Sequence, residues 1–252
     1  MTLRALFVAS GIFLAAPAAL AQATPEATIA RFVGLANAGE LTTPEGQAIL
    51  TGEAKQFATD AKSALPAADK VIIATPALAV ARMVLQAGSG EEADVYFYLE
   101  KTPGGWAVSS YRAMAMTGMN QMLLAELRKR RNLSPTEQLE KLNLELALSS
   151  DSELRSWFDA NQTKLAALTA AFLAADDSAQ DKVDPGTTAD LKQLGLAAIE
   201  EANGEVRIVI GGMLDNTVGF LKPGPSGPPS ISPSEYIWVE DVGNGWFLFR
   251  TT

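Results

Sequence analysis

Two stretches of the chain, far apart in the sequence, share one hairpin pattern. YFYLEKTPGGW at residues 96–106 aligns without gaps on YIWVEDVGNGW at residues 236–246. In both stretches, aromatic and β-branched residues precede a glycine-containing turn and a tryptophan, which is typical of antiparallel strands. Asn244-Gly245 between apolar runs is a strong signal for a two-residue hairpin loop. The chain therefore has to build at least two antiparallel hairpins.

Helix-start signals precede both hairpins. Four segments combine an N-cap residue with the proline or glutamate that opens a helix: 24–26, 43–45, 134–137 and 150–153. We therefore predict an α+β fold of two lobes, each with helices packed on an antiparallel β-meander, and a helical segment between them. The first lobe is assigned to residues 22–132, and residues 133–252 are assigned to the helical segment and the second lobe. The matching hairpins leave two explanations open, a duplicated helix-then-meander unit or independent convergence on one hairpin pattern.

The first 21 residues have the three-part layout of a secretory signal peptide. Arg4 precedes an apolar stretch, and Ala19-Leu20-Ala21 supplies small residues at the positions that a signal peptidase recognises. The apolar stretch is short for a membrane span and is broken by Pro17. We expect cleavage after Ala21, export to a bacterial periplasm, and no membrane span in the mature chain that begins at Gln22. A lipid anchor is excluded because no cysteine follows the apolar stretch.

The composition removes several kinds of chemistry. The 252 residues include no cysteine and no histidine, which excludes a disulfide, a thiolate nucleophile, a Ser-His-Asp triad and imidazole metal ligands. With 20 Lys+Arg against 29 Asp+Glu, the net charge of -9 argues against a nucleic-acid partner. We expect no cofactor and no metal, and an unknown small molecule or protein as the partner.

The first lobe, from Thr24 to Ala113, resembles the nuclear-transport-factor-like, or cystatin-like, half-cone. The matching features are N-terminal helices followed by long antiparallel strands, with DVYFYLEKTPGGWAVSSYRA as the last hairpin. The resemblance implies a cavity between a helix and a curved sheet. Some relatives in that superfamily are isomerases that use an Asp base and a Tyr donor in the cone. No motif in this chain fixes which carboxylate points inward, so the resemblance implies no reaction.

Four aromatic residues of the first hairpin are the candidate ligand-binding residues: Tyr96, Tyr98, Trp106 and Tyr111. On a strand, Tyr96 and Tyr98 share one face, and Val95, Phe97 and Leu99 share the other. Tyrosine hydroxyls in a pocket suit an amphipathic ligand, whereas the alternative is ordinary sheet packing.

A catalytic alternative pairs a carboxylate with a tyrosine. Asp94 beside Tyr96 or Tyr98 has the types of group needed for proton abstraction, provided that the carboxylate is desolvated and its pKa is raised. A position for Asp94 at the exposed start of a strand opposes that interpretation, and we assign no catalytic residue.

Two groups of possible metal ligands are interpreted as structural. Thioethers bind copper(I), and four methionines lie close together: Met114, Met116, Met119 and Met122. We assign them to packing at a strand-to-helix junction, because no His or Cys accompanies them. Four aspartates suggest calcium but lack the ligand spacing of a helix-loop-helix site, so we predict a solvated loop: Asp176, Asp177, Asp181 and Asp184.

Two further segments have simple structural interpretations. Arg128-Lys129-Arg130-Arg131 is a basic run at a predicted helix C-terminus, where it complements the helix dipole. The proline-rich stretch from Pro223 to Pro233 is either a polyproline ligand or a rigid loop that shields a sheet edge, and we favour the loop.

The functional expectation is an exported, non-catalytic binding or interaction module. Two alternatives stay open. One is a cofactor-free isomerase or hydrolase that uses a carboxylate and a tyrosine in the first-lobe cavity. The other is a protein inhibitor or immunity protein that uses an exposed face. Only the enzyme alternative requires a carboxylate that is buried in a cavity beside Tyr96, Tyr98 or Tyr111. This requirement distinguishes it from the binding module and from the inhibitor or immunity protein.

Overall fold

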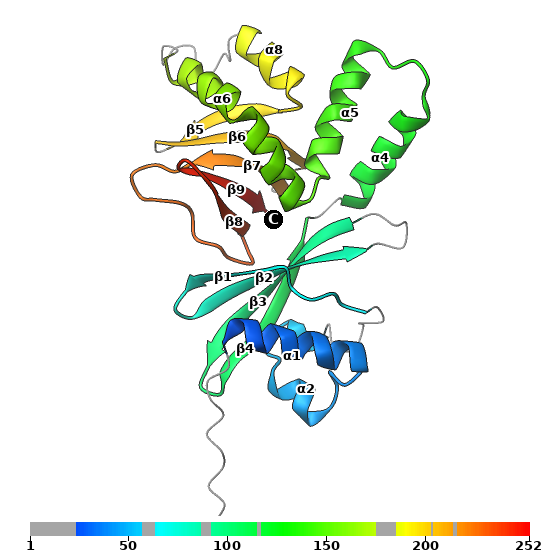
Figure 1. Ribbon diagram of the computed structural model, residues 1–252, viewed down its shortest axis with the longest axis vertical. Coiled ribbons are helices and arrows are strands. Elements are labelled where there is room, and N and C mark those ends of the chain that lie inside the picture. Colours follow the sequence, from blue (N-terminus) through cyan, green and yellow to red (C-terminus); the bar gives the residue numbers. More distant parts are fainter. Residues whose placement is uncertain are drawn as a thin grey trace, which may run out of the picture.

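A computed structural model describes residues 24–56, 64–86, 92–114, 117–174, 185–202, 204–213 and 216–252. It contains helices and two antiparallel sheets, which confirms the predicted α+β class (Figure 1). The predicted signal peptide lies outside these residues. No helix within the described ranges combines the length and the apolar character needed to cross a membrane.

The first lobe holds two short helical elements and a four-stranded sheet. Its elements are α1 (Pro25–Ala38), α2 (Pro44–Ala48), β1 (Lys70–Thr75), β2 (Leu78–Gln86), β3 (Glu92–Thr102) and β4 (Gly105–Ala113). The strand order β1-β2-β3-β4 is the predicted meander. Both predicted helix starts are correct, because Thr24 and Thr43 each accept a hydrogen bond from a backbone amide of the first turn.

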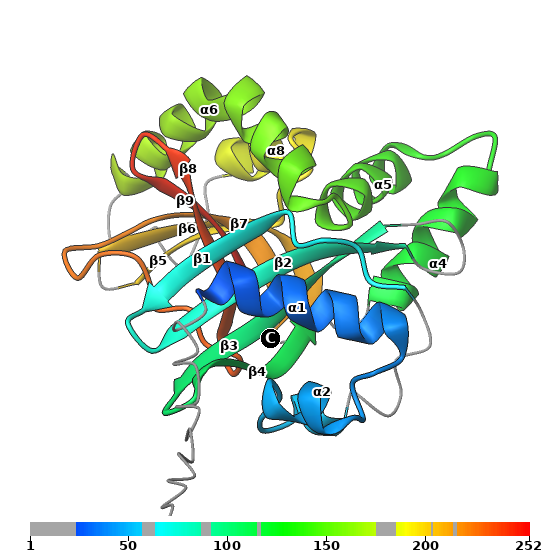
Figure 2. The same cartoon turned by 60° about the horizontal axis from the view of Figure 1, so that its bottom comes forward.

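The helix α1 lies across one face of the first sheet (Figure 2). Its apolar side buries Ile29 and Phe32 against Phe97, Leu99 and Val108 of the sheet. The ring centroids of Phe32 and Phe97 lie 5.3 Å apart. This apolar cluster fills the space between α1 and the middle of the sheet, and an open pocket of about 400 Å³ lies between α1 and the start of β1.

The middle of the chain is helical, with helices at the starts predicted for 134–137 and 150–153. It comprises α4 (Thr117–Lys129), α5 (Pro135–Ala147), α6 (Asp151–Ala174) and α8 (Pro185–Gln193). Ser134 and Glu137 form the predicted capping box at the start of α5. The helices α4 and α5 form a hairpin that projects from the body of the molecule (Figure 1). The predicted division at residues 132 and 133 falls between these two helices, which pack on each other through Leu124, Leu127 and Leu144.

The second sheet has five strands: β5 (Ala198–Ala202), β6 (Glu205–Met213), β7 (Asn216–Lys222), β8 (Tyr236–Gly243) and β9 (Trp246–Thr251). Its order is β5-β6-β7-β9-β8, so the predicted meander runs only from β5 to β7. The proline-rich stretch connects β7 to β8 and is long enough to carry β8 past the position of β9. The last hairpin therefore joins the sheet through its second strand.

This topology separates the two hairpins that share a sequence pattern. The hairpin β3–β4 joins its sheet through β3, which pairs with β2, whereas β8–β9 joins through β9, which pairs with β7. Each loop has two residues, because Thr102 pairs with Gly105 and Gly243 pairs with Trp246. The two hairpins are therefore similar in sequence and loop length, but they pair with their sheets through different strands.

The molecule has four layers: helices, first sheet, second sheet, helices (Figure 1). The second sheet packs one face on α6, where Phe158 contacts both Phe220 and Trp246. Its other face meets the first sheet in an apolar cluster that includes Tyr96, Tyr98 and Trp238. We call this contact between the sheets the lobe junction.

Candidate functional site

The structure places the four predicted aromatic residues on two different faces of the first sheet. Tyr96 and Tyr98 are fully buried in the lobe junction. Tyr111 stacks on Phe97 with a centroid distance of 6.0 Å, and Trp106 packs on the cluster beneath α1. The sheet thus brings Tyr96 and Tyr98 together and separates them from Tyr111 and Trp106.

A bulge in β4 places Tyr111 on the second face, whereas Trp106 lies there through its pairing with Lys101. Tyr98 pairs with Ser110 but Leu99 pairs with Val108, so Ser109 is an extra residue that shifts the alternation of the strand. Tyr111 therefore lies opposite Phe97, on the side that faces α1. The hydroxyl of Ser109 donates to the carbonyl of Tyr98 at 3.3 Å.

Both junction tyrosines donate hydrogen bonds across the junction. The Tyr96 hydroxyl donates to Asp151 Oδ2 at 2.9 Å, and the Tyr98 hydroxyl donates to the carbonyl of Ile237 at 2.8 Å. Burial raises the pKa of both phenols above the ordinary tyrosine value. They are therefore neutral donors at physiological pH, and their polar atoms are occupied by the protein itself.

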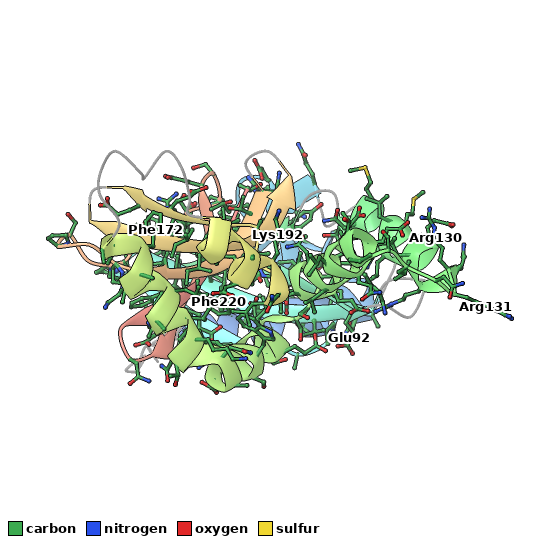
Figure 3. All side chains as sticks on the ribbon, turned by 90° about the horizontal axis from the view of Figure 1, so that it is seen from above. Glu92, Arg130, Arg131, Phe172, Lys192 and Phe220 are labelled. Carbon is green, nitrogen blue, oxygen red and sulfur yellow. The ribbon has the colours of Figure 1, made fainter. Side chains whose placement is uncertain are left out.

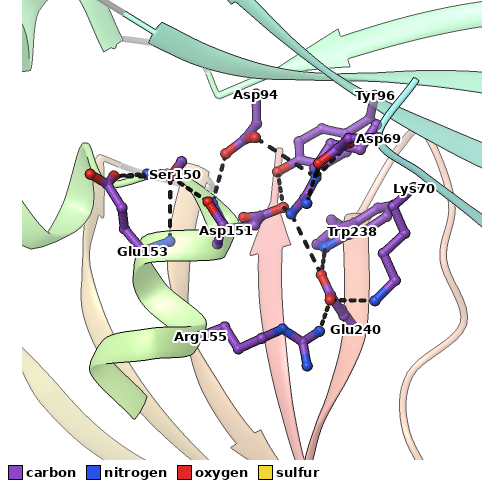
Figure 4. A network of polar contacts seen from close by, with 12 residues as sticks. Asp69, Lys70, Asp94, Tyr96, Ser150, Asp151, Glu153, Arg155, Trp238 and Glu240 are labelled. Atoms are coloured by element: carbon purple, nitrogen blue, oxygen red, sulfur yellow. Dashed lines mark hydrogen bonds and ion pairs between the residues drawn. The ribbon is translucent and has the colours of Figure 1, made fainter. Parts of the chain in front are cut away.

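Beside these tyrosines lies a group of buried charges, which we call the charge cluster (Figure 4). It contains two arginines and three carboxylates: Arg82, Asp94, Asp151, Glu240 and Arg250. They come from β2, β3, the start of α6, β8 and β9, so the cluster ties both sheets to the helical segment. Burial alone lowers the pKa of both guanidinium groups, but the neighbouring carboxylates outweigh it and keep them charged.

Asp151 is the most strongly bound carboxylate of the charge cluster, and only 1% of its surface is exposed. Arg250 Nε donates to its Oδ1 at 2.8 Å, and Arg82 Nη1 lies 3.1 Å from its Oδ2. The Tyr96 hydroxyl adds a third bond. Such charge-assisted bonds offset the cost of burying a carboxylate.

Asp94 has fewer close hydrogen-bond and ion-pair partners than Asp151. Its Oδ2 accepts from the backbone amide of Asp151 at 2.9 Å and lies 3.5 Å from Arg250 Nη2. Its Oδ1 has no hydrogen-bond partner among the described residues, and Arg82 Nε is 3.9 Å away. Burial and the nearby charge of Asp151 raise the pKa of Asp94 to about 6, against the opposing effect of Arg250.

Glu240 connects the charge cluster to Trp238 and to two partly exposed cations. Trp238 Nε1 donates to its Oε2 at 3.0 Å, and Arg82 Nη1 is 3.7 Å from the same oxygen. Lys70 and Arg155, both partly exposed, form ion pairs with its Oε1. Arg82 also binds Asp69 at the rim. With Lys70, Arg155 and Asp69 added at the rim, four cationic side chains face four carboxylates.

The space beside the charge cluster is too small for a substrate. A cavity of about 40 Å³ is lined by Asp94, Arg250, Met114, Thr117 and Asn120, among others. At 10–15 Å³ for each water, it holds roughly three water molecules. The carboxylate and tyrosine required by the catalytic alternative are thus close together, but their polar atoms are enclosed.

The sequence did not single out most of this cluster. Arg82 and Arg250 each stand alone as a charge in an apolar strand, LAVARMVLQ and WFLFRT, whereas Glu240 is followed by Asp241 in YIWVEDVG. Long charged side chains are almost never buried without a partner. A lone charge in such a strand is the signal that could have identified the two arginines, although it does not reveal which carboxylate faces it.

Of the other predicted groups, Met114 lines the small cavity beside the charge cluster. Met114 packs at the lobe junction, whereas Met122 is 70% exposed on α4. The structure does not describe Met116 or the four aspartates from Asp176 to Asp184. No metal-binding group of three or more Asp or Glu side chains occurs in the described part of the chain. In the basic run, Arg128 and Lys129 form ion pairs with Glu145 and Glu126. Arg130 and Arg131 lie at the outer tip of the helical hairpin, far from Phe220 (Figure 3).

An open groove lies on the second sheet, next to the end of β8. Its volume is about 500 Å³, and we call it the sheet groove. Val209, Tyr236 and Phe249 give it apolar surface, and Thr217 and Thr251 bring hydroxyls that bond to each other at 2.8 Å. The Arg207 guanidinium lies over the Tyr236 ring, 5.5 Å from its centroid, and is neutralised by Glu205. Glu200 and Glu235 are exposed on its rim.

Comparisons with known proteins gave no match to a family model, to a curated protein or to a solved structure. The function therefore has to be argued from the geometry of this chain alone.

Proposed function

We propose that the protein is an exported, non-catalytic binding module that takes a small amphipathic ligand in the sheet groove. The observation behind this proposal is the difference in space between the charge cluster and the sheet groove. The charge cluster borders a cavity of about 40 Å³, whereas the sheet groove offers about 500 Å³. Ligand sites in proteins usually measure about 300–1,000 Å³ and combine apolar walls with a few polar groups.

The charges around the sheet groove favour a cationic ligand. Arg207 is paired with Glu205, so it adds no net charge. Glu200 and Glu235 are exposed on the rim and leave it acidic. A positive group near these carboxylates, with an apolar body on the partly exposed Val209, satisfies both parts of the groove. A primary amine attached to an aromatic ring is the simplest molecule of this kind.

The enzyme alternative has less support from the same geometry. Asp94 and Tyr96 are the types of group that it requires, but the Tyr96 hydroxyl is used by Asp151. A general base has to reach the proton that it removes, directly or through one water. The small cavity beside Asp94 leaves no room for a substrate in that position. The inhibitor alternative differs in requiring a protein partner on an exposed face, so it predicts no small-molecule binding in the sheet groove.

A titration followed by amide NMR shifts tests the binding proposal. Phenethylamine is added to the purified mature protein, and phenylacetate serves as the probe of opposite charge. We expect phenethylamine to shift the amides of Val209, Thr217 and Thr251. Because an exposed ion pair contributes at most about 1 kcal/mol, Glu200→Gln and Glu235→Gln should each weaken binding by up to about fivefold. Glu40→Gln, on the first lobe, is the control and should leave the affinity unchanged.

Three results count against this proposal. Shifts that fall outside the sheet groove disprove the site. Equal binding of phenylacetate disproves the preference for a cation. Unchanged affinity in both rim variants shows that the exposed carboxylates do not select the ligand.

The export part of the proposal rests on the leader sequence. Its layout supports cleavage after Ala21 and a periplasmic mature chain. Mass spectrometry of the protein from fractionated cells should find Gln22 at the N-terminus in the periplasmic fraction. An intact Met1 on soluble protein contradicts it.

A further inference from the structure

Two aspartates at the lobe junction share two arginines unequally. Asp151 receives the close contacts, with Arg250 Nε at 2.8 Å and Arg82 Nη1 at 3.1 Å. Asp94 is 3.5 Å from Arg250 and 3.9 Å from Arg82. The two arginines therefore bind Asp151 more closely than Asp94.

The least stabilised oxygen of the pair is Asp94 Oδ1. It is buried and has no hydrogen-bond partner among the described residues. Asp94 also lines the small cavity, which has room for water. An ionised carboxylate places part of its charge on this buried oxygen without a protein donor, whereas a protonated carboxyl is neutral and avoids that cost.

We propose that Asp94 is a proton-binding switch that tightens the lobe junction in mildly acidic medium and loosens it in neutral medium. The proton binds Oδ1, the oxygen that has no hydrogen-bond partner among the described residues. Oδ2 keeps its bond from the Asp151 amide in both states. The switch joins β3 of the first sheet to α6 and β9, so it acts on the contact between the lobes.

The charged groups around Asp94 support this assignment. Arg82 faces it from β2, Asp151 from α6 and Arg250 from β9. On its own strand, Glu92 lines the same cavity and adds another carboxylate. The side of the cavity formed by α4 contributes Thr117 and Asn120, which are neutral. No described cation other than the two arginines forms an ion pair with Asp94.

The direction of the pH effect follows from proton linkage. Burial, followed by the charge of Asp151, raises the pKa of Asp94 from 3.8 to about 6. The docked state therefore holds a proton that the undocked or unfolded state has released. The contribution of Asp94 to docking is fully present below about pH 4, weakens as the pH rises toward about 6, and is lost above it. The sign is opposite to that of an ordinary salt-bridged carboxylate, which loses stability in acid.

Two measurements on the full mature chain test the switch. Carbon-detected NMR of the Asp94 carboxyl should give a titration midpoint near pH 6. Thermal melts should show a higher midpoint at about pH 5.5 than at about pH 7.5 in the wild type. Asp94→Asn mimics the protonated side chain, because its amide oxygen can accept from the Asp151 backbone and its NH₂ can face the cavity. This variant should lose the pH-dependent difference, whereas Asp159→Asn, an exposed substitution on α6, should retain it.

Hydrogen exchange locates the effect within the molecule. After correction for intrinsic rates, the Asp151 amide should exchange faster at about pH 7.5 than at about pH 5.5, because it is the donor to Asp94. A carboxyl resonance of Asp94 that does not change between about pH 5 and 7 overturns the proposal. A wild-type pH dependence in Asp94→Asn overturns it as well. If that variant does not fold, the NMR titration and the exchange measurement on the wild type decide.

Discussion

Tyr96 of the first sheet stacks on Trp238 of the second, with ring centroids 5.0 Å apart and an interplanar angle of 30°. Each ring also reaches the charge cluster, Tyr96 through its hydroxyl to Asp151 and Trp238 through its indole NH to Glu240. The Arg82 guanidinium lies 5.7 Å from the centroid of the Trp238 ring. The two residues therefore connect the apolar and polar parts of the lobe junction.

Removing the Tyr96 hydroxyl should weaken the junction without disturbing the stacked rings. Tyr96→Phe deletes a bond to an ionised carboxylate, and such bonds contribute about 1.5–3 kcal/mol to the free energy of unfolding. Tyr98→Phe is the matched control, because its lost bond goes to a neutral carbonyl and is worth about 0.5–1.5 kcal/mol. Urea unfolding of the two variants measures the difference. A smaller loss for Tyr96→Phe than for Tyr98→Phe contradicts the charged role of Asp151.

Arg250 is the cation whose loss should cost most stability. Arg250→Met leaves Asp151 and Asp94 buried with one arginine between them, and breaking a buried pair in this way costs about 3–5 kcal/mol. Arg31→Met, which removes an exposed pair with Glu45, should cost no more than about 1 kcal/mol. Denaturant melts at neutral pH compare the two. A similar small loss in both variants shows that the charge cluster does not hold the lobes together.

Gly219 should not tolerate a side chain, because the sheet leaves no space for one. A Cβ atom at this position lies 2.2 Å from the carbonyl oxygen of Ile208 and 3.0 Å from the ring of Phe249. Gly219→Ala should therefore destabilise the second sheet by about 1–3 kcal/mol or more. Gly34→Ala, inside α1 and with no atom within 4 Å of the new Cβ, should be stabilising by roughly 0.5–1 kcal/mol. A neutral result at Gly219 indicates that β6 and β9 can move apart at this point.

The local elements of the fold could be predicted from the sequence, because each depends on residues close together in the chain. Capping residues such as Thr24 and Ser134 satisfy backbone amides of the first helical turn. The two-residue loop at Asn244 has a positive φ of 54°, which the Asn-Gly pattern anticipates. The insertion of β9 between β7 and β8 depends on a long connection, and no local pattern specifies it.

The candidate site was less predictable for the same reason. Alternation on β3 correctly placed Tyr96 and Tyr98 on one face and Phe97 on the other. The bulge at Ser109 moved Tyr111 to the opposite face, and the sequence around it contains no glycine to indicate a bulge. The charge cluster joins residues as distant in the chain as Arg82 and Glu240, so their proximity follows only from the packing of the two sheets.

The two tryptophans that follow the hairpin loops occupy similar places with different burial. Each packs toward the helices of its own lobe, Trp106 beside the cluster under α1 and Trp246 against Phe158 of α6. Trp246 is 4% exposed, whereas Trp106 is only partly buried. Burial of a large ring contributes in proportion to the area removed from water.

Replacing these tryptophans should therefore give unequal losses. Trp246→Ala should cost about 3–5 kcal/mol, the usual range for a buried aromatic side chain. Trp106→Ala should cost less, because part of its ring is in contact with water in the folded state. Denaturant melts of both variants measure the order. Equal losses below about 1 kcal/mol fit cross-strand caps rather than core anchors. A larger loss at Trp106 places the main anchor of the first lobe at its hairpin instead of at Phe32 and Phe97.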